Sequence, residues 1–179
     1  MNCSASFFMQ NFKYCCNIKC IYIYWYKLIQ VKIEDEIKQP KFKTDYQKMI
    51  INIIFTAGWI SVRNSEMLKA YKVTTQQYNI LRILKGQYPK PATVNLLIDR
   101  MLDKMSNASR IVDRLHAKKL VTRTACPEDR RRVDVVITDK GLKLLDKVDD
   151  MEAHWEKYFK NLTKKEVRQI NELLDKFRN

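Results

Sequence analysis

Three consecutive arginines, Arg130 to Arg132, are the residues in this chain best suited to a chemical task. They follow Pro127, Glu128 and Asp129 and precede an apolar run that alternates with polar residues. Adjacent guanidinium groups repel one another and gain nothing from burial. We therefore expect these arginines to meet a negatively charged partner outside the protein core.

The chain offers little for catalysis or metal binding. His116, His154 and Cys126 have no metal-ligand spacing with one another. There is no Gly-rich phosphate loop, and no nucleophile stands with a base and an orienting partner. We therefore expect no enzymatic activity, no cofactor and no metal, and we interpret Cys126 as an incidental surface thiol rather than a sensor.

The net charge indicates what kind of partner the protein binds. Lys and Arg exceed Asp and Glu by 34 − 20 = 14 in 179 residues. Such an excess is typical of proteins that bind polyanions, most often nucleic acid and less often a membrane surface. Four of the five cysteines lie in the first twenty residues, which is no disulfide framework and favours a reducing, cytoplasmic location.

Residues 1–30 differ in composition from the remainder, 31–179, which we expect to form one domain. They contain no acidic residue, glycine or proline. Their stretch CIYIYWYKLI is too short, and too interrupted by Lys19 and Lys27, to span a bilayer. The segment can be a membrane-surface anchor, a partner-binding arm or translated sequence upstream of the true start. The abrupt change at Val31 favours the third.

The remainder predicts a mainly α-helical fold with a small β-hairpin. Helical apolar spacing predicts a long helix over about 44–70, and Thr74 with Gln77 forms a capping box for the next helix. The segment KGQYPKPAT then breaks the pattern. Two short amphipathic helices follow, capped by Thr93 and by Ser106, and together they predict a helix-turn-helix.

The second short helix has two distinct faces. Its apolar stripe consists of Ala108, Ile111, Val112 and Leu115. Polar side chains suited to directional hydrogen bonds remain, and the candidates for DNA contact are Ser106, Asn107, Ser109, Arg110 and Arg114. A recognition helix reads base edges in the major groove with residues of its first turns.

A β-hairpin with a basic tip follows, over about 120–138. Two short apolar runs predict its strands, and its tip holds Asp129, Arg130 and Arg131. A helix-turn-helix followed by such a hairpin is a winged helix. Arginines on the tip can reach a narrow minor groove, whose negative potential attracts them without base-specific hydrogen bonds.

Further helices flank the predicted winged helix on both sides. Thr138 caps one helix, and Thr163 with Glu166 forms a capping box for the last, both within 139–179. With the helix over 44–70, they carry more apolar surface than a winged helix needs. We therefore expect the flanking helices to mediate a homodimer.

The order of these pieces resembles the MarR (multiple antibiotic resistance regulator) family of winged-helix transcriptional regulators. The resemblance runs from about Glu34 to the C-terminus and lies in VTTQQYNILRIL, MSNASRIVDRL, KKLVTR and, most specifically, DRRRVDVVITDKG. In that last segment the matching positions are Asp129, Arg131, Thr138, Lys140 and Gly141.

The resemblance implies an obligate homodimer with interleaved terminal helices, in which each winged helix reads half of a palindrome. It places Arg131 in the minor groove, braced by Asp129, and the helix from Ser106 in the major groove. One departure is Lys119, which stands where the family usually has Gly. Because no cysteine lies between Val31 and Ala125, the peroxide sensing of one family branch is not expected.

The sequence thus predicts a homodimeric repressor that binds double-stranded DNA at a palindromic operator and is released by a small molecule. The aromatic residues Trp59, Tyr71, Trp155 and Phe159 can line a cavity for an aromatic effector, or they can be core. Two alternatives are a winged-helix module that contacts only proteins and a membrane-surface protein anchored by residues 1–30.

Overall fold

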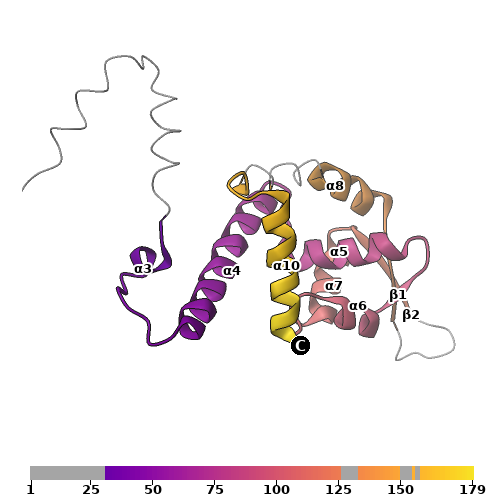
Figure 1. Cartoon of the computed structure of the whole chain (residues 1–179). Coiled ribbons are helices and arrows are strands. Elements are labelled where there is room, and N and C mark those ends of the chain that lie inside the picture. Colours follow the sequence, from indigo (N-terminus) through magenta and orange to yellow (C-terminus); the bar gives the residue numbers. More distant parts are fainter. Residues whose placement is uncertain (1–30, 126–132, 150–154, 156–157) are drawn as a thin grey trace, which may run out of the picture. The chain divides into compact units, whose positions relative to one another are not determined.

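The computed structural model describes residues 31–125, 133–149, 155 and 158–179 (Figure 1). The chain divides into two units, residues 1–57 and 58–179. In the first unit, helix α3 (Ile33–Glu36) precedes the start of α4 (Asp45–Lys69). Lys48 donates a hydrogen bond to Glu34 at 2.6 Å and thereby lowers the pKa of that carboxyl group.

Helix α4 matches the helix predicted over about 44–70. Beyond it, Lys72 adopts a left-handed conformation with φ of 56°, and α5 (Thr75–Gln87) begins. The predicted capping box of α5 is confirmed. The Thr74 hydroxyl oxygen accepts from the Gln77 N–H at 3.2 Å, and Gln77 Oε1 accepts from the Thr74 N–H at 3.3 Å.

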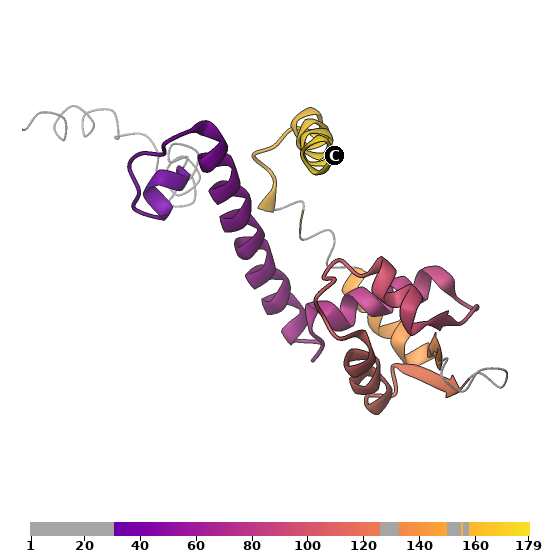
Figure 2. The same cartoon turned by 90° about the horizontal axis from the view of Figure 1, so that it is seen from below.

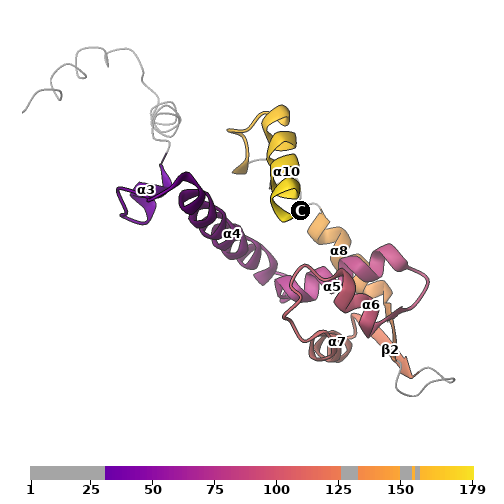
Figure 3. The ribbon, with the colours of Figure 1, turned by 60° about the horizontal axis from the view of Figure 1, so that its bottom comes forward.

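Helix α5 is the central element of the second unit. It contacts α6 (Val94–Arg100), α7 (Ala108–Ala117), α8 (Asp139–Asp149) and strand β3 (Val133–Ile137). Figure 3 shows α5 among α6, α7 and α8. These elements contribute the fully buried side chains of Ile80, Leu81, Leu84, Leu97, Val112, Leu115, Val135 and Leu145. Burial of one such side chain contributes roughly 1.5–3 kcal/mol, so this core fixes α7 against α5.

The sheet has three antiparallel strands in the order β1-β3-β2. Strand β2 (Val121–Ala125) and β3 form the predicted hairpin. It lies at one edge of the second unit (Figure 2). Strand β1 (Ala92–Thr93), which pairs with β3, was not predicted. Two residues after a proline-rich turn give no alternating pattern, so the sequence carries no signal for this strand.

The turn after α7 is made without glycine. Lys119 has φ of 60°, its N–H donates to the His116 carbonyl at 2.8 Å, and the Leu120 N–H donates to the Leu115 carbonyl at 3.0 Å. These two bonds define a Schellman motif. A non-glycine residue in this conformation costs about 1–2 kcal/mol, which the two hydrogen bonds and the buried Leu120 offset.

The caps predicted for the last helices are confirmed. The Thr138 hydroxyl oxygen accepts from the Gly141 N–H at 3.2 Å at the start of α8, and Thr163 with Glu166 forms a capping box for α10 (Lys164–Arg178). None of the residues of α10, all of which are described, is buried. Its large apolar side chains Val167, Ile170, Leu173 and Phe177 are exposed.

Candidate nucleic-acid interface

Helix α7 is capped by Asn107 and not by Ser106. Asn107 Oδ1 accepts a hydrogen bond from the Arg110 N–H at 3.0 Å, the usual N-cap interaction. The sequence-based assignment of the cap to Ser106 is therefore wrong. The Ser106 hydroxyl instead donates to Asp103 Oδ2 at 2.5 Å, because it lies one residue too early to reach the free N–H groups of the helix.

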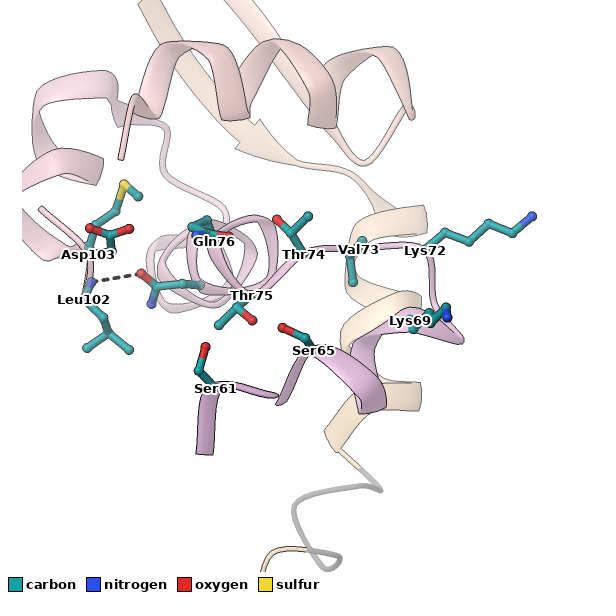
Figure 4. A pocket seen from close by; sticks show the side chains of 12 residues that line it. Ser61, Ser65, Lys69, Lys72, Val73, Thr74, Thr75, Gln76, Leu102 and Asp103 are labelled. Atoms are coloured by element: carbon teal, nitrogen blue, oxygen red, sulfur yellow. Dashed lines mark hydrogen bonds between the residues drawn. The ribbon is translucent and has the colours of Figure 1, made fainter. Parts of the chain in front are cut away.

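Hydrogen bonds connect the turn before α7 to α5, and further hydrogen bonds form within the turn. Asn79 on α5 accepts from the Leu102 N–H at 3.1 Å (Figure 4). Asp103 also accepts from the Met105 N–H at 3.0 Å. The hydroxyl of Ser106, followed by the N–H of Met105, lowers the pKa of the Asp103 carboxyl group. The entry to α7 is therefore a fixed turn with an ionised carboxylate.

The structure separates the two faces of α7 as the apolar spacing predicts. The predicted stripe, Ala108, Ile111, Val112 and Leu115, is buried. Of the candidate contact residues, Ser106 is half-buried, whereas the others are exposed: Asn107, Ser109, Arg110 and Arg114. The helix thus presents an amide, a hydroxyl and two guanidinium groups on one open face, and their contact with DNA stays a prediction.

An ion pair between α7 and the hairpin was not predicted. Arg123 on β2 donates to the carboxylate of Asp113 on α7. Both side chains are largely exposed, so the pair contributes little to stability. Its geometric consequence is more relevant, because it connects the middle of α7 with the strand that leads toward the hairpin tip. No sequence spacing predicts a pair formed across two elements.

The predicted contact residues at the tip, Asp129, Arg130 and Arg131, lie outside the described residues. What the structure does establish is the base of the hairpin, with Ala125 paired to Val133 on either side of that segment. The strands on either side of residues 126–132 are therefore paired up to the residues next to that segment. The roles of these three residues stay predictions.

A pocket of about 520 Å³ lies between α4, α5 and α8. Its lining residues are Ile60, Asn64, Met67, Leu68, Tyr78, Val148, Trp155 and Phe159. The rings of Trp155 and Phe159 stack with centroids 5.7 Å apart and planes at 12°. This arrangement suits a flat, largely apolar molecule.

Only two of the four aromatic residues proposed for a cavity are in that lining. Trp155 and Phe159 belong to it. Trp59 instead packs edge-on against Tyr158, with centroids 6.1 Å apart, and holds the Arg63 guanidinium 3.5 Å from its own ring centroid. Tyr71 donates its hydroxyl proton to the Lys147 carbonyl at 3.1 Å. Its position in the α4–α5 turn directs it toward α8.

A second pocket, of about 610 Å³, lies between α4, the first turn of α5 and the turn before α7. Figure 4 shows the hydroxyl groups of Ser61 and Ser65 facing the start of α5, whereas the side chain of Lys72 extends away from the pocket. The polar groups that face this pocket lie on partly or fully exposed residues. It is a hollow surface rather than a closed site.

Two further expectations concern metals and membranes. In the part of the chain that the structure describes, no three His, Cys, Asp or Glu residues lie close enough together to hold a metal ion. The described helices also include none with the length and apolar character needed to cross a bilayer.

Known proteins are similar to this chain in sequence. Residues 71–132 match the model of the MarR family. The regulator MhqR of Bacillus subtilis is 30% identical over 127 residues, which cover 68% of this chain and 85% of MhqR. The repressor IacR of Pseudomonas putida is 26% identical over 110 residues, which cover 61% of this chain but slightly less than two thirds, 65%, of IacR.

Solved structures agree in fold. A complex of Staphylococcus aureus MepR with DNA has a TM-score of 0.65 at 20% identity and covers 76% of this chain and 97% of MepR. Bordetella bronchiseptica BpsR, studied for regulation of its DNA binding by 6-hydroxynicotinic acid, has a TM-score of 0.62 at 22% identity, with 72% and 91% covered. The chain therefore belongs to the MarR family of winged-helix transcriptional regulators and not to a family of enzymes.

Proposed function

We propose that this protein is a homodimeric repressor that binds a palindromic operator and is released by a small aromatic molecule. One observation carries the proposal. Helix α7 packs on the core through a buried stripe, while its opposite face presents exposed Asn107, Ser109, Arg110 and Arg114. A helix with amide, hydroxyl and guanidinium groups on its open face suits insertion into the major groove.

The proposed affinity and the proposed specificity have different sources. The net charge of +14 favours neutralisation of phosphates, which supplies sequence-independent affinity that falls as salt rises. Discrimination between sequences comes from Asn107, Ser109 and Arg110 at base edges. Arg131, supported by Asp129, fixes register in the minor groove, and Arg130 contacts phosphate. The DNA complex of MepR supports a DNA-bound role for this fold.

The proposal of a homodimer rests on apolar surface that the single chain leaves open. Large apolar side chains are exposed on α4 and α10, namely Met49, Ile50, Ile54, Phe55, Val62, Val167, Ile170, Leu173 and Phe177. Monomeric soluble proteins rarely expose apolar groups in such continuous helical rows. A second copy of the chain covers them in a twofold arrangement, which matches the symmetry of a palindrome.

The proposal of an aromatic effector rests on the pocket lined by Trp155 and Phe159. A volume of about 520 Å³ accommodates a small ring compound. The regulation of BpsR by 6-hydroxynicotinic acid shows that one neighbour of this fold responds to such a molecule. Because the pocket is lined by α4 as well as by α5 and α8, an occupant there can favour a dimer whose recognition helices are wrongly spaced for DNA.

Substitutions at Asn107 are expected to separate helix capping from base reading. Asn107→Ala removes both the cap and the amide, and should lower the free energy of unfolding by about 1 kcal/mol and alter base preference. Asn107→Ser keeps an oxygen for the Arg110 N–H, and should leave stability within a few tenths of a kcal/mol while still altering base preference. Urea unfolding and selection of bound sequences measure the two effects, and an unchanged preference in both variants would remove Asn107 from the reading surface.

The experiment that tests the proposed function is selection of bound duplexes from random DNA, followed by binding over a salt series. We expect a palindromic sequence, a complex containing two copies of the 21.4 kDa chain, and log affinity that falls linearly with log salt concentration. Absence of binding at low salt would leave the protein-interaction alternative. Binding to anionic vesicles that is lost with residues 1–30 would instead support the membrane-surface alternative.

A further inference from the structure

The side chain of Lys118 connects the end of α7 with the junction between α4 and α5. Lys118 is the C-cap residue of α7. Its Nζ donates to the carbonyl oxygen of Lys72 at 2.6 Å and to Oε1 of Gln77 at 2.9 Å. Both acceptors are features of helix ends: Lys72 is the left-handed residue that terminates α4, and Gln77 closes the capping box of α5.

Gln77 makes this connection specific. It is 3% exposed and is the one buried polar residue in the described part of the chain. Its Oε1 accepts from both the Thr74 N–H and the Lys118 ammonium group. A charged donor at this distance forms a stronger hydrogen bond than a neutral one. The Lys118 side chain is itself exposed, but its ammonium group bonds to two acceptors that belong to helix-end motifs of α4 and α5.

The main chain at the same point is bonded to the start of α8. Lys140 on α8 donates to the Lys118 carbonyl at 2.9 Å, and the Thr138 hydroxyl donates to the Lys119 carbonyl at 2.9 Å. The C-terminal end of α7 is thus bonded to the α4–α5 junction through a side chain and to the start of α8 through its carbonyl groups. Helices α4 and α8 both continue toward segments that we propose to be dimer-forming.

We propose that Lys118 is a positioning residue that sets the angle of the recognition helix relative to the dimerisation helices, and thereby the spacing of the two half-sites that the protein accepts. The proposal rests on the proposed function. A dimer reads two half-sites about one helical turn of DNA apart, roughly 10 base pairs, so each added base pair both shifts and rotates the second site. A firmly held helix rejects such a change, and a loosely held helix tolerates it.

The test uses synthetic duplexes that contain the half-site recovered by selection with the wild-type protein, at the preferred spacing and at spacings one base pair shorter and longer. The variants are Lys118→Met, Lys118→Arg and, as a matched control, Lys119→Met. Lys119 carries the same charge at the adjacent position, and its exposed side chain has no polar partner among the described residues. The full-length dimer is used throughout, and thermal unfolding checks that each variant folds.

The expected result is a change in spacing preference confined to Lys118→Met. Its ratio of affinities for the preferred and altered spacings should fall about threefold to tenfold, which is the effect of losing the net contribution of one ordinary hydrogen bond. Lys118→Arg keeps a charged donor and should retain most of the ratio. Lys119→Met should weaken binding equally at every spacing, because it removes only a charge.

Other outcomes overturn the proposal in distinguishable ways. Lys118→Met could instead lose affinity equally at every spacing and depend less on salt than the wild type, as expected for Lys119→Met. That result would make Lys118 a phosphate contact. A lower melting temperature with an unchanged spacing ratio would make its role purely structural. If the wild-type protein selects no sequence and binds no duplex, the proposed function itself fails, and the positioning role falls with it.

Discussion

Gly141→Ala is expected to lower the free energy of unfolding by about 3 kcal/mol, although alanine is ordinarily the better helix former. Gly141 lies in the first turn of α8 and is buried. A Cβ atom added there would come within 2.6 Å of Ile137 Cγ1 and closer still to the carbonyl oxygen of Leu120. That carbonyl cannot move freely, because it also accepts from the Thr138 N–H at 3.1 Å.

A matched control for this substitution exists in the same domain. Gly86, near the end of α5, has no atom within 4 Å of the position of an added Cβ, apart from those of its own residue, its chain neighbours and the nearby backbone of its helix. Gly86→Ala should therefore raise the free energy of unfolding by about 0.5–1 kcal/mol through higher helix propensity. Urea unfolding of both variants measures the difference, and effects of the same sign would show that close packing at Gly141 is not what excludes a side chain.

Gly141 also illustrates what sequence and structure each contribute. Its place after Thr138 and Lys140 is part of the pattern by which the chain resembles its family. The pattern by itself gives no reason for glycine, because α8 is an ordinary helix at that point. The reason is the close approach of α8 to Leu120, and such an approach between distant segments has no signature in local periodicity.

The helices, their caps and the buried stripe of α7 could be predicted because they follow from local rules. A capping box needs two residues three positions apart, and an amphipathic helix needs regular apolar spacing. The boundary at Ser106 was wrong because Ser106 and Asn107 are both good caps, and only the geometry of the turn distinguishes them. Local rules fix the element but leave its first residue open.

The connections between elements could not be predicted. Strand β1, the Asp113–Arg123 ion pair and the Lys118 ammonium bridge all join residues that the fold brings together from separate segments. Each involves residue types that are equally common on solvated surfaces. Two of these connections, the Asp113–Arg123 pair and the Lys118 bridge, join α7 and its C-cap to neighbouring elements. The sequence therefore predicts the candidate DNA-contact residues, but it does not predict the contacts between elements that position them.

Arg131→Ala is expected to weaken operator binding by about 1–3 kcal/mol, the scale of one good groove contact. The residue lies outside the described part of the chain, so the expectation comes from its place in DRRRVDVVITDKG and from the hairpin base that the structure does describe. Strands β2 and β3 flank this segment in the chain, with Ala125 paired to Val133. An arginine there can enter a narrow minor groove, where the negative potential is strongest.

Arg132→Ala is the matched control, because it removes the same charge from the adjacent position. We expect Arg132 to meet phosphate or solvent, so its loss should reduce affinity less and equally on all sequences. A duplex in which G·C pairs replace A·T pairs beneath the wing widens the minor groove. Wild-type protein and Arg132→Ala should bind that duplex more weakly than the selected operator, whereas Arg131→Ala should no longer distinguish the two. If Arg131→Ala still binds the selected operator more tightly than the G·C-substituted duplex, by the same factor as the wild type, another residue reads the minor groove. Loss of charge alone would weaken binding of Arg131→Ala and Arg132→Ala to both duplexes equally.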